Sequence, residues 1–412
     1  MTAVTPSKGG FFAIDARIWA RVTACGMNES AAYLVLANGT GRNNKGTRWS
    51  TNAVMNYTGI GWERAKNAIG RLIAGGFIRC AESHTEARPC YELATYRELV
   101  DHEAATNPPA KPDYFEQELL SGLQAGRQPT NKTGRNRAER LCQRGLLCRD
   151  AQGVYKLPEP ATEDSGDNSI WLPNEIVKGT LSGEESPVRR LRSAGCIWTL
   201  RLFVDLYAAQ NLRDDGGISP RFIWQEFDRQ KIGEQGAYAV WGFKSGKSFH
   251  GWTGPFIAHQ GRTKAKPEDQ SPAWESLHLL KNMGLLSFVP HIFDNDTDTA
   301  EPIHVFGVGG IAEAPREQEI GEATDLAARA MALPSKLAEA EENDFEHFCP
   351  ILKTKPTAQM IGVARLTYRP HTRRTAEWFA ELNRAAQGWI ETFDRLAEKG
   401  EKASYQRAAN YA

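Results

Sequence analysis

The clearest pattern of apolar and polar positions lies near the start of the chain, where three successive segments carry apolar residues at helical spacing. The segments cover residues 31–37, 51–58 and 62–74, and this spacing predicts three amphipathic helices. Ser50 stands where an N-cap residue belongs, directly before the second helix. Gly59-Ile60-Gly61 then indicates a tight turn, in which the first glycine adopts a positive φ and the isoleucine fills the core between two helices.

Two short extended runs follow these helices. After Gly75-Gly76, residues 77–80 and 90–93 flank a polar loop and predict a two-stranded hairpin. The stretch STNAVMNYTGIGWERAKNAIGRLIAGGFIR, from Ser50 to Arg79, resembles the winged helix-turn-helix superfamily, particularly the modules of phage replisome organisers and plasmid replication initiators. The resemblance implies a capped helix, a turn, a recognition helix and a wing.

A recognition helix fits the major groove of B-DNA, and its exposed side chains reach the edges of the bases. Arginine can pair with guanine, asparagine with adenine and glutamate with cytosine, while the start of the preceding helix can meet phosphate. Trp62 departs from the usual Ser, Thr or Arg of the superfamily, and either stacks on DNA or packs against a neighbouring domain. The predicted DNA-binding residues are Ser50, Thr51, Trp62, Glu63, Arg64, Lys66, Asn67, Arg71, His84, Arg88, Arg42, Lys45 and Arg48.

A similar order of elements is predicted for residues 170–310. A long apolar helix over 196–210, a helix over 221–227 with Ser219 as its N-cap, and a helix over 274–283 precede two strands. This order predicts a second winged helix with altered recognition geometry.

A long insertion, residues 229–270, replaces the tight turn of the second copy. Its aromatic residues are interleaved with bases, which suits base stacking and phosphate contact, and equally suits a loop that packs on itself. Residues 242–248 end like a phosphate-binding P-loop, but Trp241 occupies the position of the first glycine, so nucleotide hydrolysis is not predicted. The second-site DNA-binding candidates are Lys244, Lys247, Arg262, Lys264 and Lys266.

Polar linkers at 106–112 and 158–169 divide the chain. Between them, a helix over 115–123, a basic helix over 133–143 and a hairpin predict a small unit that is either a truncated winged helix with phosphate contacts or a basic surface patch. The predicted domains are a winged helix at 1–105, the small basic unit at 111–158, the second winged helix at 170–310 and a helical region at 311–412. The predicted fold class is α+β, mostly helical, with tandem winged helix-turn-helix domains.

The last long helix is predicted over residues 375–399. Leu382, Trp389 and Leu396 are spaced seven apart on its apolar stripe, and Gly400 is predicted to end it. Such a stripe fits docking on the protein's own core, and it fits a homodimer that binds a repeated DNA site.

The net charge of zero, with 50 Lys+Arg against 50 Asp+Glu, conceals opposed blocks. Residues 127–149 hold seven bases and one acid, whereas residues 313–346 hold ten acids and three bases. Basic blocks apart from an acidic one suggest contact with a polyanion, and the acidic block either keeps the protein soluble, contacts a partner or competes with DNA.

The remaining composition is that of an ordinary soluble protein. No apolar run is long enough to cross a membrane, no secretory signal is recognisable, and the seven scattered cysteines suit a reducing compartment, so a cytoplasmic location is expected. No catalytic signature, metal-ligand cluster or cofactor motif stands out. The sequence therefore predicts a non-enzymatic protein that binds double-stranded DNA sequence-specifically, as a transcriptional regulator or a replication initiator of a mobile element. The alternative is an adaptor whose winged helices bind protein in a nucleoprotein or defence assembly.

Overall fold

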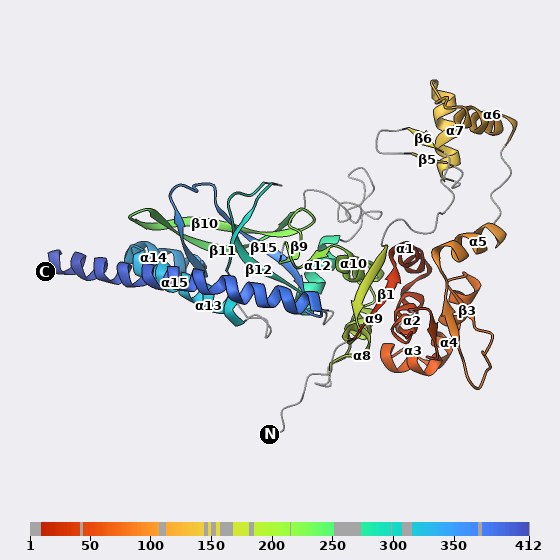
Figure 1. The fold of residues 1–412 in the computed structure, drawn as a ribbon, viewed down its shortest axis with the longest axis horizontal. Coiled ribbons are helices and arrows are strands. Elements are labelled where there is room, and N and C mark those ends of the chain that lie inside the picture. Colours follow the sequence, from red (N-terminus) through yellow and green to blue (C-terminus); the bar gives the residue numbers. More distant parts are fainter. Residues whose placement is uncertain are drawn as a thin grey trace. The chain divides into compact units, whose positions relative to one another are not determined.

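The protein is a mixed α/β chain with antiparallel sheets, and its computed structural model is drawn in Figure 1. The residues described are 10–41, 44–106, 113–143, 147–149, 154–156, 168–180, 185–214, 216–250, 273–297, 299–306, 315–369 and 373–411. The chain divides into a smaller unit, Ala13–Ser169, and a larger unit, Met1–Phe12 with Ile170–Ala412. The boundaries between the two units fall within β1 (Phe11–Asp15) and within β7 (Ser169–Pro173), and these two strands pair as a two-stranded sheet.

The smaller unit begins with a helical module that carries a three-stranded sheet. Its elements are α1 (Ala16–Cys25), α2 (Met27–Asn38), β2 (Gly46–Thr47), α3 (Thr51–Thr58), α4 (Trp62–Ala74), β3 (Ile78–Cys80), β4 (Tyr91–Leu93) and α5 (Tyr96–Thr106). The strand order is β2-β4-β3 and both pairings are antiparallel. The order of helices, turn and hairpin predicted for residues 28–93 is confirmed, with α3 and α4 at the predicted bounds.

Helix α2 is the centre of this module. Its residues from Glu29 to Asn38 are all buried, because α1, α3 and α4 pack around it. Gly59 has a φ of +70° and ends α3, and Ile60 is only 3% exposed, as the sequence predicts for the turn. This turn fixes the angle between α3 and α4, and so fixes which face of α4 remains exposed.

The rest of the smaller unit is a compact basic module. It consists of α6 (Tyr114–Gln124), α7 (Lys132–Gln143), β5 (Cys148–Arg149) and β6 (Tyr155–Lys156), and the two strands pair antiparallel. Its core contains Leu123, Ala138, Leu141, Leu147 and Tyr155. The two helices and the hairpin predicted for 111–158 are therefore confirmed.

The larger unit is built on one six-stranded antiparallel sheet with the order β13-β12-β15-β10-β11-β14. The strands are β10 (Trp224–Gln235), β11 (Tyr238–His250), β12 (Leu286–Phe293), β13 (Pro302–Val305), β14 (His347–Leu352) and β15 (Gln359–Leu366), with a short pair β8 (Gln210–Asn211) and β9 (Gly217–Ile218). The helices are α8 (Glu175–Lys178), α9 (Pro187–Ala194), α10 (Ile197–Ala208), α12 (Ala273–Asn282), α13 (Pro315–Met331), α14 (Pro334–Glu342) and α15 (Arg373–Tyr411).

This sheet contradicts the prediction of a second winged helix at 170–310. The helix predicted over 221–227 is wrong, because β10 begins at Trp224 and pairs with both β11 and β15. Most of the described part of the predicted insertion, 229–250, is the hairpin of β10 and β11. The boundary predicted at residue 310 is also wrong, because β14 and β15 lie in the same sheet as the strands that precede it.

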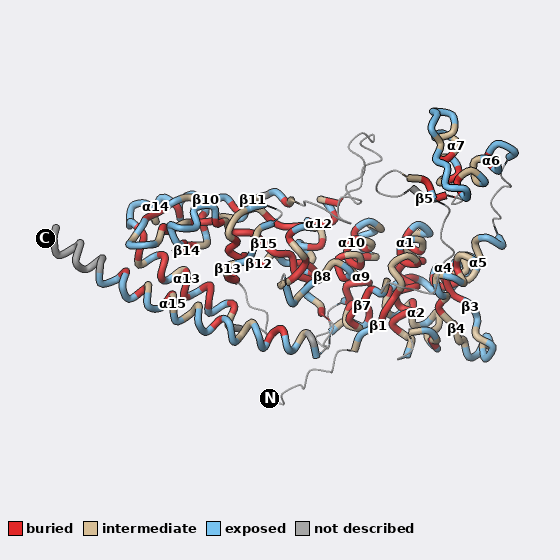
Figure 2. Tube along the Cα trace, turned by 45° about the horizontal axis from the view of Figure 1, so that its top comes forward, coloured by how far each residue is buried: buried red, intermediate tan, exposed pale blue. Residues whose placement is uncertain are grey.

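The sheet curls until side chains of its two edge strands meet. His304 Nε2 on β13 lies 3.9 Å from Cys349 Sγ on β14, and the rings of Phe306 and His347 are 5.5 Å apart. The concave side encloses a core that includes Phe227, Phe243, Ile292, Ile351 and Met360. Figure 2 shows this interior as buried, while the outer surfaces of α14 and α15 contain many exposed residues.

Helices α13 and α15 lie side by side along the sheet (Figure 1). Ala386, Phe393 and Ala397 of α15 are buried together with residues of α13, β12 and β13. The apolar stripe of α15 therefore docks on the chain's own core, which is the first of the two alternatives that the sequence allows. The predicted end at Gly400 is wrong, since α15 continues to Tyr411. A Cβ at Gly400 would lie 2.9 Å from atoms of Ala330, so this glycine permits the close approach of α15 to α13.

A buried ion pair joins α13 to β15. Arg365 is fully buried, and its two terminal nitrogens donate to the Glu317 carboxylate at 2.7 and 2.9 Å. Its Nε donates to the Gly216 carbonyl, and His291 Nε2 lies 3.4 Å from the guanidinium. The acidic block at 313–346 thus contributes at least one carboxylate to the core, and is not only a solvated surface.

Two buried histidines are expected to make the stability of this unit dependent on pH. Burial lowers the pKa of His291 to about 3, with a further contribution from the Arg365 charge, and lowers the pKa of His304 to about 4. The unfolded chain titrates near pH 6.5, so below that pH it binds protons that the folded chain excludes. The free energy of unfolding should fall by about 1.4 kcal/mol per pH unit for each histidine as the pH drops from about 6.5 toward the folded pKa.

Urea unfolding at a series of pH values checks this dependence. His304→Gln should make the free energy of unfolding less steeply dependent on pH in acid, by about one proton. An identical slope in wild type and His304→Gln would show that this histidine does not titrate on unfolding.

None of the helices that the structure describes contains an apolar stretch of the length needed to span a bilayer.

Candidate nucleic-acid interface

A surface groove of about 990 Å³ lies between the start of α3, the outer face of α4 and the loop that joins β3 to β4. It is lined by Ser50, Thr51, Asn52, Trp62, Lys66, Asn67, Ile69, Gly70, Arg71, Ile73, His84, Glu86, Ala87, Pro89 and Tyr91. Seven of the residues predicted to bind DNA belong to this lining, and they come from three separate elements. The fold therefore gathers positions up to 34 residues apart, from Ser50 to His84, onto one surface.

The start of α3 forms one wall of the groove. The backbone N–H groups in the first turn of a helix have no partner within the helix, and they carry the positive end of the helix dipole. Ser50 occupies the N-cap position, as the sequence predicts. Its side chain, however, makes no capping hydrogen bond. Thr51 and Asn52 extend the same polar edge. Asn52 is not among the sequence candidates, although it directly follows two of them at a helix start.

The outer face of α4 forms the floor. Trp62 is 46% exposed, and Lys66 Nζ lies 5.0 Å from the centroid of its ring. This cation–π contact places an ammonium group over an aromatic face at the start of the helix. Asn67 is exposed beside them, and the inward positions Ala65 and Leu72 are fully buried, as the spacing predicts.

Two further candidates on α4 are exposed but do not line the groove. Glu63 and Arg64 lie on the first turn of the helix, where both side chains are accessible. Their position one turn from Asn67 extends the polar surface of α4 beyond the groove.

Arg71 lines the groove, but its charge is already engaged. Its guanidinium pairs with Glu29 on α2, a carboxylate that is only 3% exposed. The sequence predicts Arg71 as a DNA contact, and the structure adds a second role, because the buried carboxylate needs a positive partner. The outward spacing on α4 is consistent with both roles, since Arg71 extends from the exposed face toward the buried N-terminal turn of α2.

The loop between β3 and β4 forms the second wall. His84 Nδ1 lies 3.0 Å from the carbonyl oxygen of Cys90 and 3.1 Å from its nitrogen, and the imidazole packs 5.0 Å from the Tyr91 ring. His84 therefore fixes the loop as well as lining the groove. Backbone hydrogen bonds join Thr85 and Arg88 in both directions and close the loop tip.

The charges of this loop are mixed. Arg88 is exposed at the tip without lining the groove, whereas Glu86 does line it. A carboxylate there disfavours phosphate and can accept a hydrogen bond from an amino group of a base. Sequence reasoning missed Glu86, because the loop length alone does not show which residues turn inward.

Three bases were predicted in the segment before α3. Lys45 and Arg48 are exposed on either side of β2, and Arg42 lies outside the described residues. Neither exposed base is among the residues that line the groove. Such charges attract a polyanion without reading its sequence.

The second-site candidates do not assemble a comparable surface in the described part of the chain. Lys244 on β11 donates to the Asn343 carbonyl at 3.4 Å and lies 5.2 Å from the Phe345 ring, so it packs on its own unit. The neighbouring aromatic Phe249 is buried and stacks on Phe288. The sequence leaves two uses open for the aromatic residues of 229–270, base stacking and packing. Those that the structure describes pack within their own unit. The side chain of Lys247, together with Arg262, Lys264 and Lys266, lies outside the described residues.

Comparison of the chain with family models, curated proteins and solved structures gave no match. Within the residues that the structure describes, no group of three or more His, Cys, Asp or Glu side chains could hold a metal ion. The groove combines hydroxyl, amide, imidazole, ammonium and guanidinium groups with one carboxylate and one exposed indole. Groups of these kinds can bind phosphates and the edges of bases, while the Glu86 carboxylate disfavours phosphate.

Proposed function

We propose that residues 27–93 form a winged helix that binds double-stranded DNA, with α4 as its recognition helix and the β3–β4 loop as its wing. The observation that carries the proposal is the groove, because its two walls and its floor come from the elements that a winged helix presents to DNA. The start of α3 supplies N–H groups and hydroxyls for phosphate. The exposed face of α4 supplies side chains that can reach base edges.

The proposed contacts divide into two kinds. Asn67 and Arg64 have the donor and acceptor patterns that recognise adenine and guanine in the major groove. Lys66, Lys45 and Arg48 carry positive charge toward the phosphates and supply affinity that is independent of sequence. We therefore assign the protein to sequence-specific duplex binding without catalysis.

The biological use that we propose is regulation of transcription or initiation of replication on a mobile element. The two uses differ in the arrangement of bound sites, since an initiator binds clustered repeats beside an origin and a regulator binds an operator. Mapping the bound sites across a genome separates them. The exposed Trp62 is also what a protein-binding adaptor would present, so duplex binding must be measured directly.

Two single substitutions test the division of roles. Arg64→Ala should cost about 1–3 kcal/mol of binding free energy on the preferred site and relax the preference at one base position. Lys45→Ala should weaken binding to all sequences alike and reduce the steepness of the salt dependence by about one unit. Fluorescence anisotropy with a panel of single-base variants of the site measures both. Equal sequence profiles for wild type and Arg64→Ala would remove the assigned role of Arg64.

A further inference from the structure

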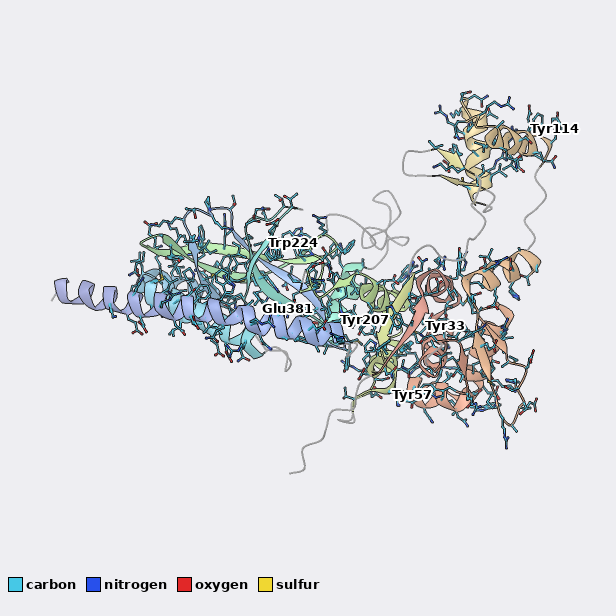
Figure 3. The ribbon with its side chains drawn as sticks, viewed as in Figure 1. Tyr33, Tyr57, Tyr114, Tyr207, Trp224 and Glu381 are labelled. Atoms are coloured by element: carbon cyan, nitrogen blue, oxygen red, sulfur yellow. The ribbon has the colours of Figure 1, made fainter. Side chains whose placement is uncertain are left out.

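Two neighbouring aromatic side chains stand exposed at the start of α6, in the small basic module. Tyr114 is 75% exposed and Phe115 is 55% exposed, and their ring centroids are 5.5 Å apart at an interplanar angle of 80°. Figure 3 labels Tyr114 at this end of the helix, and Figure 2 shows the exposed surface of α6 and α7. The module forms its core from other residues, so these two rings are not required for its packing.

The helix start that carries the rings is firmly fixed. The Asp113 side chain accepts from the Glu116 N–H at 2.7 Å, and the Glu116 carboxylate accepts from the Asp113 N–H at 3.0 Å. This reciprocal capping box holds the first turn in place and uses the carboxylate of Glu116. The two rings are therefore presented on an ordered backbone.

The charges near the rings differ between the two helices: Asp113, Glu116 and Glu118 at the start of α6 are acidic, whereas α7 carries the cations. The Arg137 guanidinium on α7 lies 4.9 Å from the centroid of the Phe115 ring. Exposed bases of the same module are Arg127, Lys132, Arg135, Arg140 and Lys156. The acidic neighbour on α7, Glu139, accepts from the Tyr155 hydroxyl at 2.9 Å, so its charge is directed into the module.

Exposed aromatic faces on a basic module, one of them in contact with the Arg137 guanidinium, match the needs of an unpaired nucleic-acid strand. Bases of a single strand offer free faces that stack on aromatic side chains, while the phosphates follow the surrounding bases. In a duplex the base faces are covered by their neighbours, and a side chain reaches only their edges or must separate the base pairs. The exposed ring pair therefore favours a single strand over a duplex.

We propose that the module of residues 113–156 binds single-stranded DNA, with Tyr114 and Phe115 as stacking platforms and the cations of α7 as phosphate contacts. The choice of DNA over RNA rests on the proposed function, because the same chain carries the groove assigned to duplex DNA. The single-strand site itself is independent of that groove. The two surfaces would allow one molecule to hold a duplex site and an adjacent melted strand.

The test compares the full-length protein with Tyr114→Ala/Phe115→Ala on a fluorescent oligothymidylate of about ten nucleotides, a length within the range bound by single-strand sites. Each base stack lost should weaken binding roughly 5- to 150-fold. Tyr114→Trp/Phe115→Trp should retain the affinity, because indole rings stack at least as well. Ser121→Ala/Gln124→Ala, at exposed positions on the same helix, serves as the matched control and should bind as wild type does.

Duplex binding is measured in parallel, so that this proposal and the proposed function fail separately. Loss of single-strand affinity in the double alanine variant, with duplex affinity unchanged, supports the module's role. Equal single-strand affinity of wild type and the double alanine variant overturns it, and so does a wild type that ignores the oligothymidylate. Tighter binding to an RNA oligonucleotide of the same sequence overturns the assignment to DNA.

Discussion

Arg365→Met is expected to lower the free energy of unfolding of the larger unit by about 3–5 kcal/mol. The substitution leaves the Glu317 carboxylate, which is 4% exposed, without the two hydrogen bonds that compensate its burial. It also removes the donor to the Gly216 carbonyl, which lies in the turn between β8 and β9. Urea unfolding followed by tryptophan fluorescence measures the change, and Trp378 serves as a local reporter because its ring centroid lies 5.5 Å from the guanidinium.

Two companion variants separate the buried charge from a general loss of side-chain bulk. Arg365→Met/Glu317→Met removes both charges and should recover most of the stability, since a buried pair replaced by apolar residues costs little. Arg373→Met breaks an ion pair with Glu377 whose arginine is 91% exposed, and should change stability by less than about 0.5 kcal/mol. If Arg365→Met unfolds at the same urea concentration as Arg373→Met, the ion pair contributes nothing to stability.

Lys66→Glu/Asn67→Ala is expected to reduce affinity for the preferred duplex on the order of 100-fold. The first change replaces a phosphate contact by a repelling charge, and the second removes a side chain that can read adenine. Both residues are exposed in the groove, so the fold of the module should be unaffected. Fluorescence anisotropy at fixed salt gives the affinity, and circular dichroism checks the helix content.

The matched control makes equivalent changes on the same module away from the groove. Arg97→Glu and Asn56→Ala alter exposed residues on α5 and α3 that do not line the groove. The combined control has the same change in net charge and should retain duplex affinity within about threefold, since only long-range charge is altered. Equal losses in the two variants would mean that net charge, and not the groove, governs binding.

The local elements of the smaller unit could be predicted because their signals lie close together in the chain. The N-cap position at Ser50, the left-handed Gly59 and the buried spacing of Ala65 and Leu72 each depend on neighbours within a few residues. The bounds of α3 and α4 follow from those signals alone. The third strand of the sheet, β2, is not predicted, because its partner β4 lies more than 40 positions further along the chain.

The sheet of the larger unit could not be predicted in the same way. Trp224 and Phe227 have the three-residue spacing of a helix face, yet β10 is held by β15, whose partner residues lie more than 130 positions away. The strand β14 lies in the region predicted as helical, 311–412, and pairs with residues of β11 more than 100 positions earlier. Its Pro350 has no N–H and is tolerated because β14 is an edge of the sheet. Pairing with distant residues fixes both strands, and the local spacing of apolar and polar residues does not show this pairing.

In the candidate site, too, some features follow from local spacing and others depend on residues distant in the chain. Spacing on α4 predicted which residues face outward, and seven of the predicted residues line one groove. The spacing could not show that Arg71 is engaged by Glu29, because that partner comes from another helix. It also could not place Glu86, whose direction depends on how the loop tip closes between Thr85 and Arg88.

The salt dependence of duplex binding by the full-length protein tests the central claim most directly. If the groove binds duplex DNA, the logarithm of the association constant should fall linearly with the logarithm of salt concentration, by about 0.9 for each phosphate contacted. Lys66→Glu should make that slope shallower by about 0.9, which is the contribution of one phosphate contact. A protein that ignores duplex DNA at about 50 mM salt, or binds it with no dependence on salt, would contradict the account and favour the protein-binding adaptor.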